Sequence, residues 1–264
     1  MNKVEKKLDV LCLGAAVVDI PLRPVSREVF DIESYPVDNI AMAVGGDAMN
    51  ESTIISRLGC KTGLMAAIGD DAAGAFILRS CDEDNIDTEG VTIDPNLNTS
   101  INIGLVTEDG ERTFITVQGA ECHFKKEWFE QIDMDNYENI YIAGYQVCGK
   151  SGEIISQWLK TVENVEEKHI FFAPGPMITA IESETMENLF ALKPILHINE
   201  AEAKGYTQQE NVEEAVRALY EKSGNLVFVT LGAEGTLFYD GKEMGRVASV
   251  KTNVVDTVGA GDSH

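Results

Sequence analysis

Residues 256–262 of this 264-residue chain, with the sequence DTVGAGD, have the composition of a phosphoryl-transfer site. Gly259, Ala260 and Gly261 have little side-chain bulk, so their amide N–H groups can converge on one anion. A helix that begins there would add the positive end of its dipole. Asp262 follows directly and can take the proton of an attacking hydroxyl. The simpler interpretation is a tight turn with a helix-capping Asp.

A second glycine-bearing segment, GYQVCGKS at residues 144–151, matches the P-loop pattern G-x-x-x-x-G-K-[ST]. It follows a predicted strand and precedes a predicted helix, as a P-loop must. Two observations count against it. Tyr145, Gln146 and Val147 are bulky where a phosphate needs close approach of the backbone, and no later predicted strand ends in the Asp that would hold magnesium. The alternative is an ordinary turn with Lys150 in solvent.

A third segment, GGDAMN at residues 45–50, stands at the start of a predicted helix. The paired glycines Gly45 and Gly46 would let the backbone approach a ligand. The amide of Asn50 offers both a donor and an acceptor to a hydroxyl. Alone the segment is a weak signal, because a Gly-Gly turn before an Asp-capped helix is common.

The charge of the chain restricts its partners. Lys and Arg total 21 against 44 Asp and Glu, which gives a formal net charge of −23. Binding to nucleic acid or to an anionic membrane relies on cationic side chains, so both partners are disfavoured. An anionic substrate would need local donors, and the backbone amides of residues 259–261 are such donors.

Cysteine usage and hydropathy point to a cytoplasmic protein. The five cysteines are scattered, form no C-x-x-C pair and accompany only four His, so a zinc framework is disfavoured and free thiols in a reducing compartment are expected. No uninterrupted apolar stretch approaches the roughly 20 residues that span a membrane.

The elements that must position these residues alternate along the chain. Short apolar runs predict buried strands at residues 8–13, 63–68, 139–143, 169–173, 195–198 and 226–231. Longer amphipathic segments predict helices at residues 48–58, 72–81, 151–162, 183–192 and 212–222. This alternation predicts an α/β fold in which a parallel sheet is covered on both faces.

Two stretches depart from this alternation. Residues 102–107 and 112–117 alternate apolar with polar side chains around Asp109-Gly110, which predicts a β-hairpin. Residues 21–44 are extended in character, because three prolines there oppose a long helix. We therefore expect an antiparallel flap with one wet face, inserted into the parallel core.

Taken together and in order, these motifs resemble the ribokinase-like (PfkB) carbohydrate kinases. The likeness extends over essentially the whole chain, and the segment from Asp19 to residue 50 is most similar to an uncharacterised bacterial sugar-kinase branch. The matching motifs are GAAVVD ending at Asp19, GGDAMN, EDGERTF at residues 108–114, NEAE at residues 199–202, TLGAEG at residues 230–235 and DTVGAGD. The resemblance implies a three-layer α/β/α core with a mostly parallel sheet, formed by residues 1–20, 45–98 and 121–264. It also implies a small antiparallel β lid of residues 21–44 and 99–120.

The resemblance implies roles for the matching residues in catalysis and acceptor binding. Asp262 matches the family's catalytic base. The residues that match its anion hole are Gly259, Ala260 and Gly261. The residues that match its sugar-binding positions are Asp19, Gly45, Gly46 and Asn50. For Asp19 an alternative is a residue that merely caps the end of a strand.

Further roles concern the nucleotide and its ions. Asn199 and Glu202 match the N-x-x-E motif that organises Mg²⁺ and its waters, although an Asn and a Glu at this spacing also form a helix start. Asp256 matches a position that binds a monovalent cation in some members. The residues that match the nucleotide phosphate-binding turn are Thr230, Gly232 and Gly235, which could also be only a strand-ending turn.

The sequence therefore predicts an ATP-dependent, Mg²⁺-requiring kinase that phosphorylates a hydroxyl of a small sugar or sugar-like substrate. The alternatives are a P-loop NTPase that uses residues 144–151 and a catalytically dead pseudokinase that binds a sugar or nucleoside. Family members continue beyond DTVGAGD with a helix that supports the anion hole, whereas Ser263 and His264 end this chain. We therefore expect that the chain is truncated. If it is instead the whole molecule, we expect weak or no kinase activity. The exposed face of the lid predicts a homodimer.

Overall fold

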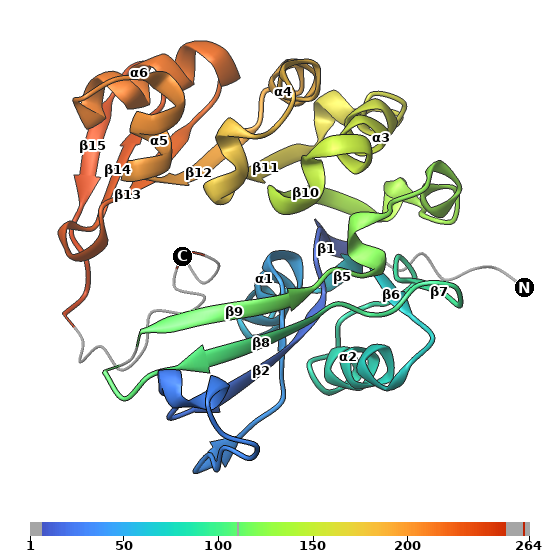
Figure 1. Ribbon diagram of the computed structural model, residues 1–264. Coiled ribbons are helices and arrows are strands. Elements are labelled where there is room, and N and C mark those ends of the chain that lie inside the picture. The colour runs from blue at the N-terminus through green and yellow to red at the C-terminus, as the bar shows by residue number, and fades with distance from the viewer. Residues whose placement is uncertain (1–6, 110, 252–260, 262–264) are drawn as a thin grey trace, which may run out of the picture.

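Two β-sheets of different size organise residues 7–109, 111–251 and 261, the part of the chain that the computed structural model describes (Figure 1). The large sheet has eight strands in the order β15-β14-β13-β12-β11-β10-β1-β5. Its strands are β1 (Leu8–Leu13), β5 (Thr62–Met65), β10 (Tyr137–Ala143), β11 (His169–Ala173), β12 (Ile195–Asn199), β13 (Val227–Thr230), β14 (Thr236–Tyr239) and β15 (Met244–Val247). All neighbours from β5 to β13 pair in parallel, as the sequence predicts.

The last two strands of the large sheet are antiparallel to their neighbours. They form a hairpin around Asp240-Gly241, which the alternation of strands and helices did not predict. A short parallel pair, β6 (Ala67–Gly69) with β7 (Thr92–Asp94), adds a separate two-stranded sheet. The strand predicted at residues 63–68 is therefore divided between β5 and β6.

Helices cover both faces of the large sheet (Figure 1). The helices are α1 (Asp47–Arg57), α2 (Ala72–Glu83), α3 (Gly149–Leu159), α4 (Ser183–Ala191), α5 (Glu200–Thr207) and α6 (Val212–Ser223). Short 3₁₀ turns lie at Arg27–Phe30, Ala120–Cys122, Lys126–Phe129, Met134–Asn136, Tyr145–Val147, Val165–Glu167, Gly175–Thr179 and Gly232–Glu234. Each predicted helix is present, and α5 is an addition.

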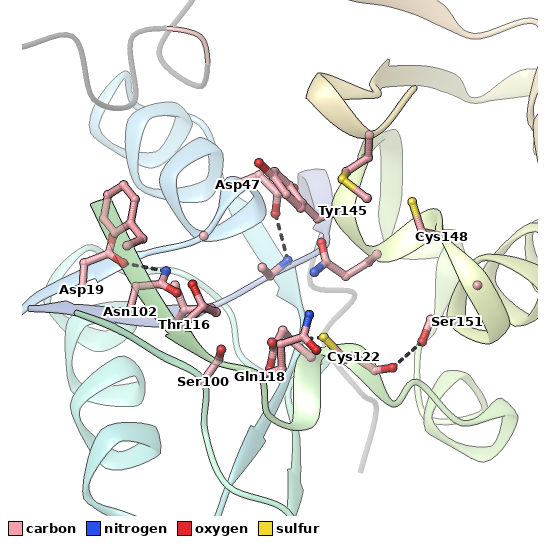
Figure 2. A pocket seen from close by; sticks show the side chains of 18 residues that line it. Asp19, Asp47, Ser100, Asn102, Thr116, Gln118, Cys122, Tyr145, Cys148 and Ser151 are labelled. Carbon is pink, nitrogen blue, oxygen red and sulfur yellow. Dashed lines mark hydrogen bonds between the residues drawn. The ribbon is translucent and has the colours of Figure 1, made fainter. Parts of the chain in front are cut away.

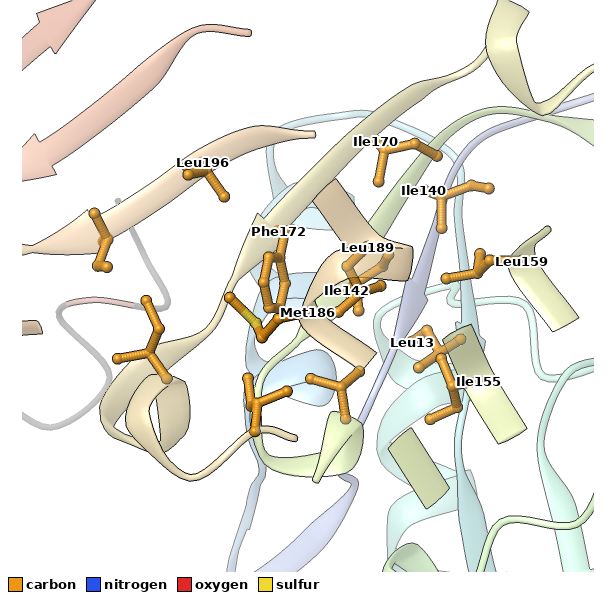
Figure 3. Close-up of a cluster of buried hydrophobic side chains, with 14 of the residues drawn as sticks. Leu13, Ile140, Ile142, Ile155, Leu159, Ile170, Phe172, Met186, Leu189 and Leu196 are labelled. Atoms are coloured by element: carbon orange, nitrogen blue, oxygen red, sulfur yellow. The ribbon is translucent and has the colours of Figure 1, made fainter. Parts of the chain in front are cut away.

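Alternate residues of the central strands enter two separate cores, because successive side chains of a strand point to opposite faces. Leu11 and Leu13 of β1 belong to the core that includes side chains of α3, α4, α5 and α6, whereas Val10 and Cys12 belong to the core that includes side chains of α1 and α2. Figure 3 shows the first core, where Leu13, Ile142 and Phe172 meet side chains of α3 and α4. Phe172 is fully buried there. The predicted two-sided coverage is thus confirmed.

The small sheet is the predicted lid. Its strands are β2 (Val17–Arg23), β3 (Asn39–Ile40), β4 (Ala43–Gly45), β8 (Ile101–Val106) and β9 (Arg112–Val117). The hairpin of β8 and β9 is confirmed, and β2 pairs with β8 in parallel, unlike its other neighbours. The chain leaves the large sheet after Leu13 and enters the small one at Val17, so Asp19 lies inside a lid strand rather than at the end of the first core strand.

No helix in the described part of the chain has the length and apolar character needed to cross a bilayer.

Candidate active site

A cavity of about 670 Å³ lies between the lid and the carboxyl ends of β1 and β10 (Figure 2). β1 and β10 are neighbours in the large sheet. After β1 the next strand of this sheet, β5, lies at one edge, whereas from β10 onward the strands follow one another toward the opposite edge. Ligands of open α/β sheets bind at such a reversal of strand order. The lining residues that carry polar or ionisable side chains are Asp19, Asp47, Ser100, Asn102, Thr116, Gln118, Glu121, Cys122, Tyr145, Gln146, Cys148 and Ser151.

The lid wall of this cavity is organised around Asp19. Register in the small sheet places Asp19 beside Asn102, whose Nδ2 donates to Asp19 Oδ1 over 2.9 Å. Burial raises the pKa of the Asp19 carboxyl above its usual 3.8, and the hydrogen bond from Asn102 partly offsets this. A side chain at Gly45 would overlap the Asp19 carboxylate, so the glycine leaves the space that this carboxylate occupies.

The opposite wall begins with the turn into α1. Gly46 has φ +94°, a conformation that side chains rarely adopt, and a Cβ there would also collide with the Ala15 carbonyl. Asp47 follows, and its Oδ1 accepts from the backbone N–H groups of Ala15 (3.0 Å) and Ala48 (2.9 Å). Gly46 and Asp47 line the cavity. Asn50 lies half-buried in the next turn of α1 and is not among the lining residues.

The P-loop-like segment forms the far wall instead of a phosphate cradle. Gly149 N, at the start of α3, donates to Glu182 Oε2 over 2.9 Å. Lys150 Nζ pairs with Glu153 Oε2 at 2.7 Å on the exposed side of the helix. Ser151 Oγ accepts from Phe124 N and donates to the carbonyl of Cys122. The groups that a P-loop would turn toward nucleotide are therefore engaged within the protein, and the geometry disfavours that hypothesis.

A smaller cavity of about 140 Å³ lies at the carboxyl ends of β10, β11, β12 and β13. Asn199, Glu202, Thr230 and Gly261 are among its lining residues. Asp47 and Tyr145 line both cavities, so the two adjoin at these side chains. The structure thus brings Asp19 and Gly46 of the predicted acceptor positions and Asn199 and Thr230 of the predicted nucleotide positions to two adjoining cavities.

Asn199 and Glu202 form a reciprocal capping box at the start of α5. Asn199 Oδ1 accepts from Glu202 N over 2.9 Å, and Glu202 Oε2 accepts from Asn199 N over 3.1 Å. The helix-start interpretation is therefore correct, and both side chains also face the smaller cavity. Burial raises the pKa of Glu202, while the hydrogen bonds with Asn199 act in the opposite direction.

These two side chains have the oxygen donors that Mg²⁺ prefers. Among the described residues no group of three or more His, Cys, Asp or Glu side chains is placed to hold a metal ion. An amide and a carboxylate fixed at the mouth of the strands fit a hydrated Mg²⁺ that is held through its waters, because this cation usually keeps several of them.

The turn after β13 has a mixed role. Thr230 lines the smaller cavity, whereas Gly232 and Gly235 do not. Gly235 is instead closely approached by the Val247 carbonyl, which leaves no room for a side chain. Of the DTVGAGD segment only Gly261 is described, and it lines the smaller cavity. Asp256, Gly259, Ala260 and Asp262 lie outside the described residues, so their roles stay predictions.

The comparison with known sequences decides the family. The sequence profile of a family described as pfkB family carbohydrate kinase matches residues 7–264. The chain belongs to this family. An uncharacterised sugar kinase of Escherichia coli strain K12, YegV, is 27% identical over 272 residues that cover 100% of this chain and 82% of the relative. This PfkB carbohydrate kinase is thus a phosphotransferase of the sugar-kinase type.

Solved structures show the same fold. A crystal structure of a fructokinase with bound ATP from Xylella fastidiosa superposes with a TM-score of 0.81 at 18% identity, covering 97% of this chain and 78% of the other. A crystal structure of a ribokinase from Thermotoga maritima gives 0.77 at 22% identity, covering 97% and 82%. The expected ribokinase-like core with its small β lid is therefore confirmed.

Sequence reasoning missed much of the larger cavity of this PfkB kinase. Asn102 and Gln118 reach it from the lid hairpin, and Gln146 and Glu121 reach it from the core. For the lid residues a signal exists, because Asn102, Thr116 and Gln118 stand at alternate positions of the hairpin strands and therefore share one face, on which Phe114 also lies. For Gln146 the signal was a bulky polar residue inside the P-loop-like segment.

Two thiols line this cavity close to carboxylates. Burial, together with the Glu121 carboxylate, raises the pKa of Cys122 to about 12. Burial and the nearby Glu182 carboxylate also raise the pKa of Cys148. Both shifts disfavour the thiolate, which is the reactive form of a cysteine.

Proposed function

We propose that the chain is an ATP-dependent kinase that transfers a phosphoryl group to a hydroxyl of a small sugar or sugar-like acceptor in the larger cavity. One observation carries this proposal. The cavity that contains Asp19 shares two wall residues, Asp47 and Tyr145, with the cavity lined by Glu202 and Gly261, so the two cavities adjoin. An acceptor and a nucleotide held in these two spaces would meet at their junction.

The larger cavity binds the acceptor in this proposal. Sugar hydroxyls donate to carboxylates and exchange hydrogen bonds with amides, and the pair of Asp19 and Asn102 supplies both groups. Of the predicted set, Asp19 and Gly46 line the cavity, and Gly45 leaves the space that the Asp19 carboxylate occupies, whereas Asn50 is not a lining residue.

The smaller cavity and the segment at residues 256–262 serve the transfer. Asp262 takes the proton of the attacking hydroxyl, and the amides of Gly259, Ala260 and Gly261 stabilise the charge of the migrating group. When bound, ATP supplies the phosphoryl group and Mg²⁺ neutralises part of its charge. Asn199 and Glu202 hold the waters of Mg²⁺. The remaining predicted contacts are the phosphate-binding turn with Thr230, Gly232 and Gly235, and the monovalent-cation residue Asp256.

The lid contributes by excluding water. Its polar inner face carries Asn102, Thr116 and Gln118, so closure over the acceptor replaces water with protein hydrogen bonds. This would suppress hydrolysis of ATP in place of transfer. In Figure 2 Asn102 and Thr116 lie on one side of the cavity, and Cys148 and Ser151 lie on the other.

The Asp262→Asn variant tests the proposal. Removal of a positioned base should lower kcat by about 10²–10⁴-fold, while acceptor binding by calorimetry stays unchanged. The control variant is Asp240→Asn, which removes the same charge from an exposed turn. Turnover near that of the parent protein would exclude Asp262 as the base.

The outer face of the lid supports a homodimer. Ile115 and Val117 alternate with the inward residues of β9, and each is about half exposed. Apolar side chains on an exposed edge strand favour pairing with another chain. Light scattering should give the mass of two chains, and Ile115→Asp should reduce it to one. A single-chain mass for the parent protein would contradict this arrangement.

A further inference from the structure

Two helices begin at the wall of the larger cavity, and in each a carboxylate of the protein accepts from one amide of the first turn. Asp47 Oδ1 accepts from Ala15 N and Ala48 N at the start of α1. Glu182 Oε2 accepts from Gly149 N at the start of α3. A helix N-terminus is a ready site for an anionic ligand, because its free N–H groups and its dipole both favour negative charge. Here the chain itself supplies that negative charge.

A third carboxylate also accepts from a backbone amide, shortly after the end of lid strand β9. Glu121 is buried, and its carboxylate accepts from Gly119 N over 3.0 Å. Together with Asp19 and Asp47 it places three acidic side chains on the cavity wall. Among the described residues that line this cavity there is no Lys, Arg or His. Lys150, which the sequence places near, pairs with Glu153 instead.

The unused hydrogen-bonding capacity of the wall includes an acceptor atom. Gln146 lines the cavity with only 5% of its surface exposed, and its Oε1 has no hydrogen-bond partner among the described residues. A buried amide oxygen without a donor is costly, so a bound molecule that donates is favoured. Hydroxyl groups donate, whereas a phosphate dianion or a carboxylate has only acceptor oxygens.

We propose that the acceptor of this kinase is an uncharged polyhydroxyl compound, and that the cavity excludes sugar phosphates and sugar acids. The inference rests on the proposed function and narrows its substrate class. An anionic acceptor would meet Asp19, Asp47 and Glu121 at close range, and it would find one amide at each helix start, Ala48 N and Gly149 N, already bound to a carboxylate. Juxtaposed like charges discriminate strongly against a wrong partner.

Matched pairs of acceptors test this class. Each pair differs by one anionic group: fructose with fructose 6-phosphate, ribose with ribose 5-phosphate, and glucose with glucuronate. Binding to the full chain is measured by calorimetry, and phosphorylation with Mg-ATP is followed separately. In the pair that binds, the neutral member should be preferred by at least about 100-fold. The preference should shrink as ionic strength rises, because salt screens charge.

Two charge variants examine the electrostatic origin of this preference. Glu182→Gln keeps an oxygen that can accept from Gly149 N but removes the charge, and Glu184→Gln removes a charge from a nearby exposed position of α4. We expect E182Q to improve the relative affinity for the anionic member about threefold or more, and E184Q to leave it unchanged. Equal ratios in the two variants would overturn the electrostatic explanation.

The outcomes separate this inference from the proposed function. Equal or better binding of a phosphorylated or carboxylated member, with phosphorylation observed, overturns the inference and leaves the kinase assignment intact. If no member of any pair binds or is phosphorylated, the proposed function and the inference fail together.

Discussion

The two adjoining cavities of this PfkB kinase are built in different ways. The smaller one collects the carboxyl ends of neighbouring parallel strands, so each of its strand-end residues comes from the same edge of one sheet. The larger one joins two sheets and takes side chains from the lid, from the turn into α1 and from the start of α3. The geometry of the smaller cavity therefore depends mainly on one sheet, whereas the geometry of the larger cavity depends on how the two sheets are placed against each other.

This difference predicts separable effects of substitution. Changes in the wall of the larger cavity should alter the affinity for the acceptor and leave the Mg²⁺ requirement unchanged. Changes at the strand ends should alter turnover and the Mg²⁺ requirement and leave acceptor affinity unchanged. A variant that changes both the acceptor affinity and the Mg²⁺ requirement would show that the cavities do not act as distinct subsites.

Among substitutions in the walls of the two cavities, Asp19→Ala should have the largest effect, on acceptor affinity. A hydrogen bond to a charged group contributes about 1.5–3 kcal/mol, so the acceptor Kd should rise roughly 10- to 150-fold. Nucleotide binding should not change, because Asp19 lines only the larger cavity. Calorimetry with acceptor and with nucleotide measures the two quantities. Asp31→Ala, at an exposed position of the lid segment, is the control.

Glu202→Gln should lower kcat by about 10- to 100-fold, the usual cost of disturbing groups that orient a metal. The variant should also need more Mg²⁺ for half-maximal rate. Because Gln can still accept from Asn199 N, the cap of α5 and the folded state are preserved. The control is Glu200→Gln in the same helical turn, where Glu200 pairs with Lys204. An unchanged Mg²⁺ requirement in E202Q would remove Glu202 from this role.

Acceptor affinity should fall at acidic pH. Burial raises the pKa of Asp19 above 3.8, so the carboxylate takes up its proton at a higher pH than an exposed Asp does. The ionised form accepts from sugar hydroxyls, and affinity is lost as pH falls through the raised value. The unliganded protein behaves oppositely, since its stability falls as pH rises from 3.8 through the raised value. Asp19→Asn should abolish the dependence of binding, which calorimetry across this range would show.

The smallest effect is expected from Lys150→Ala. Its ammonium group is exposed and pairs with Glu153 three residues on, an interaction worth little. Turnover and nucleotide affinity should both stay within about twofold of the parent protein. A loss of nucleotide binding in this variant would restore the P-loop hypothesis.

The fold could largely be predicted from the sequence, and the two cavities differ in this respect. Buried parallel strands are nearly continuous apolar runs, which is why β1 and β11 have the predicted bounds. Asn199 and Glu202 belong to one contiguous motif, and Thr230 belongs to another. Both motifs stand at the end of a predicted strand, so their location at one edge of the sheet could be predicted. The bounds of the lid were less predictable, because nothing local marks the residue at which the chain passes from one sheet to the other.

The larger cavity was harder to predict because its residues are brought together only by tertiary structure. Alternation in the hairpin gives two faces, but it does not say that the polar face turns inward and the apolar face outward. Likewise, Gly149 and Lys150 satisfy a local pattern, and it is the distant Glu182, which accepts from Gly149 N, that argues against phosphate binding there. Local spacing specifies a turn, whereas the partner of each amide depends on the whole fold.

The joint between the sheets has a mechanical consequence. Only three residues separate β1 from β2, and Asp47 anchors the middle one, Ala15, to the start of α1. Asp19 lies in β2, on the lid side of this three-residue connection, and Asp47 lies at the start of α1, on the core side. A molecule that binds to both carboxylates would therefore link the lid to the core across this connection, so that binding in the cavity would at the same time stiffen the enzyme.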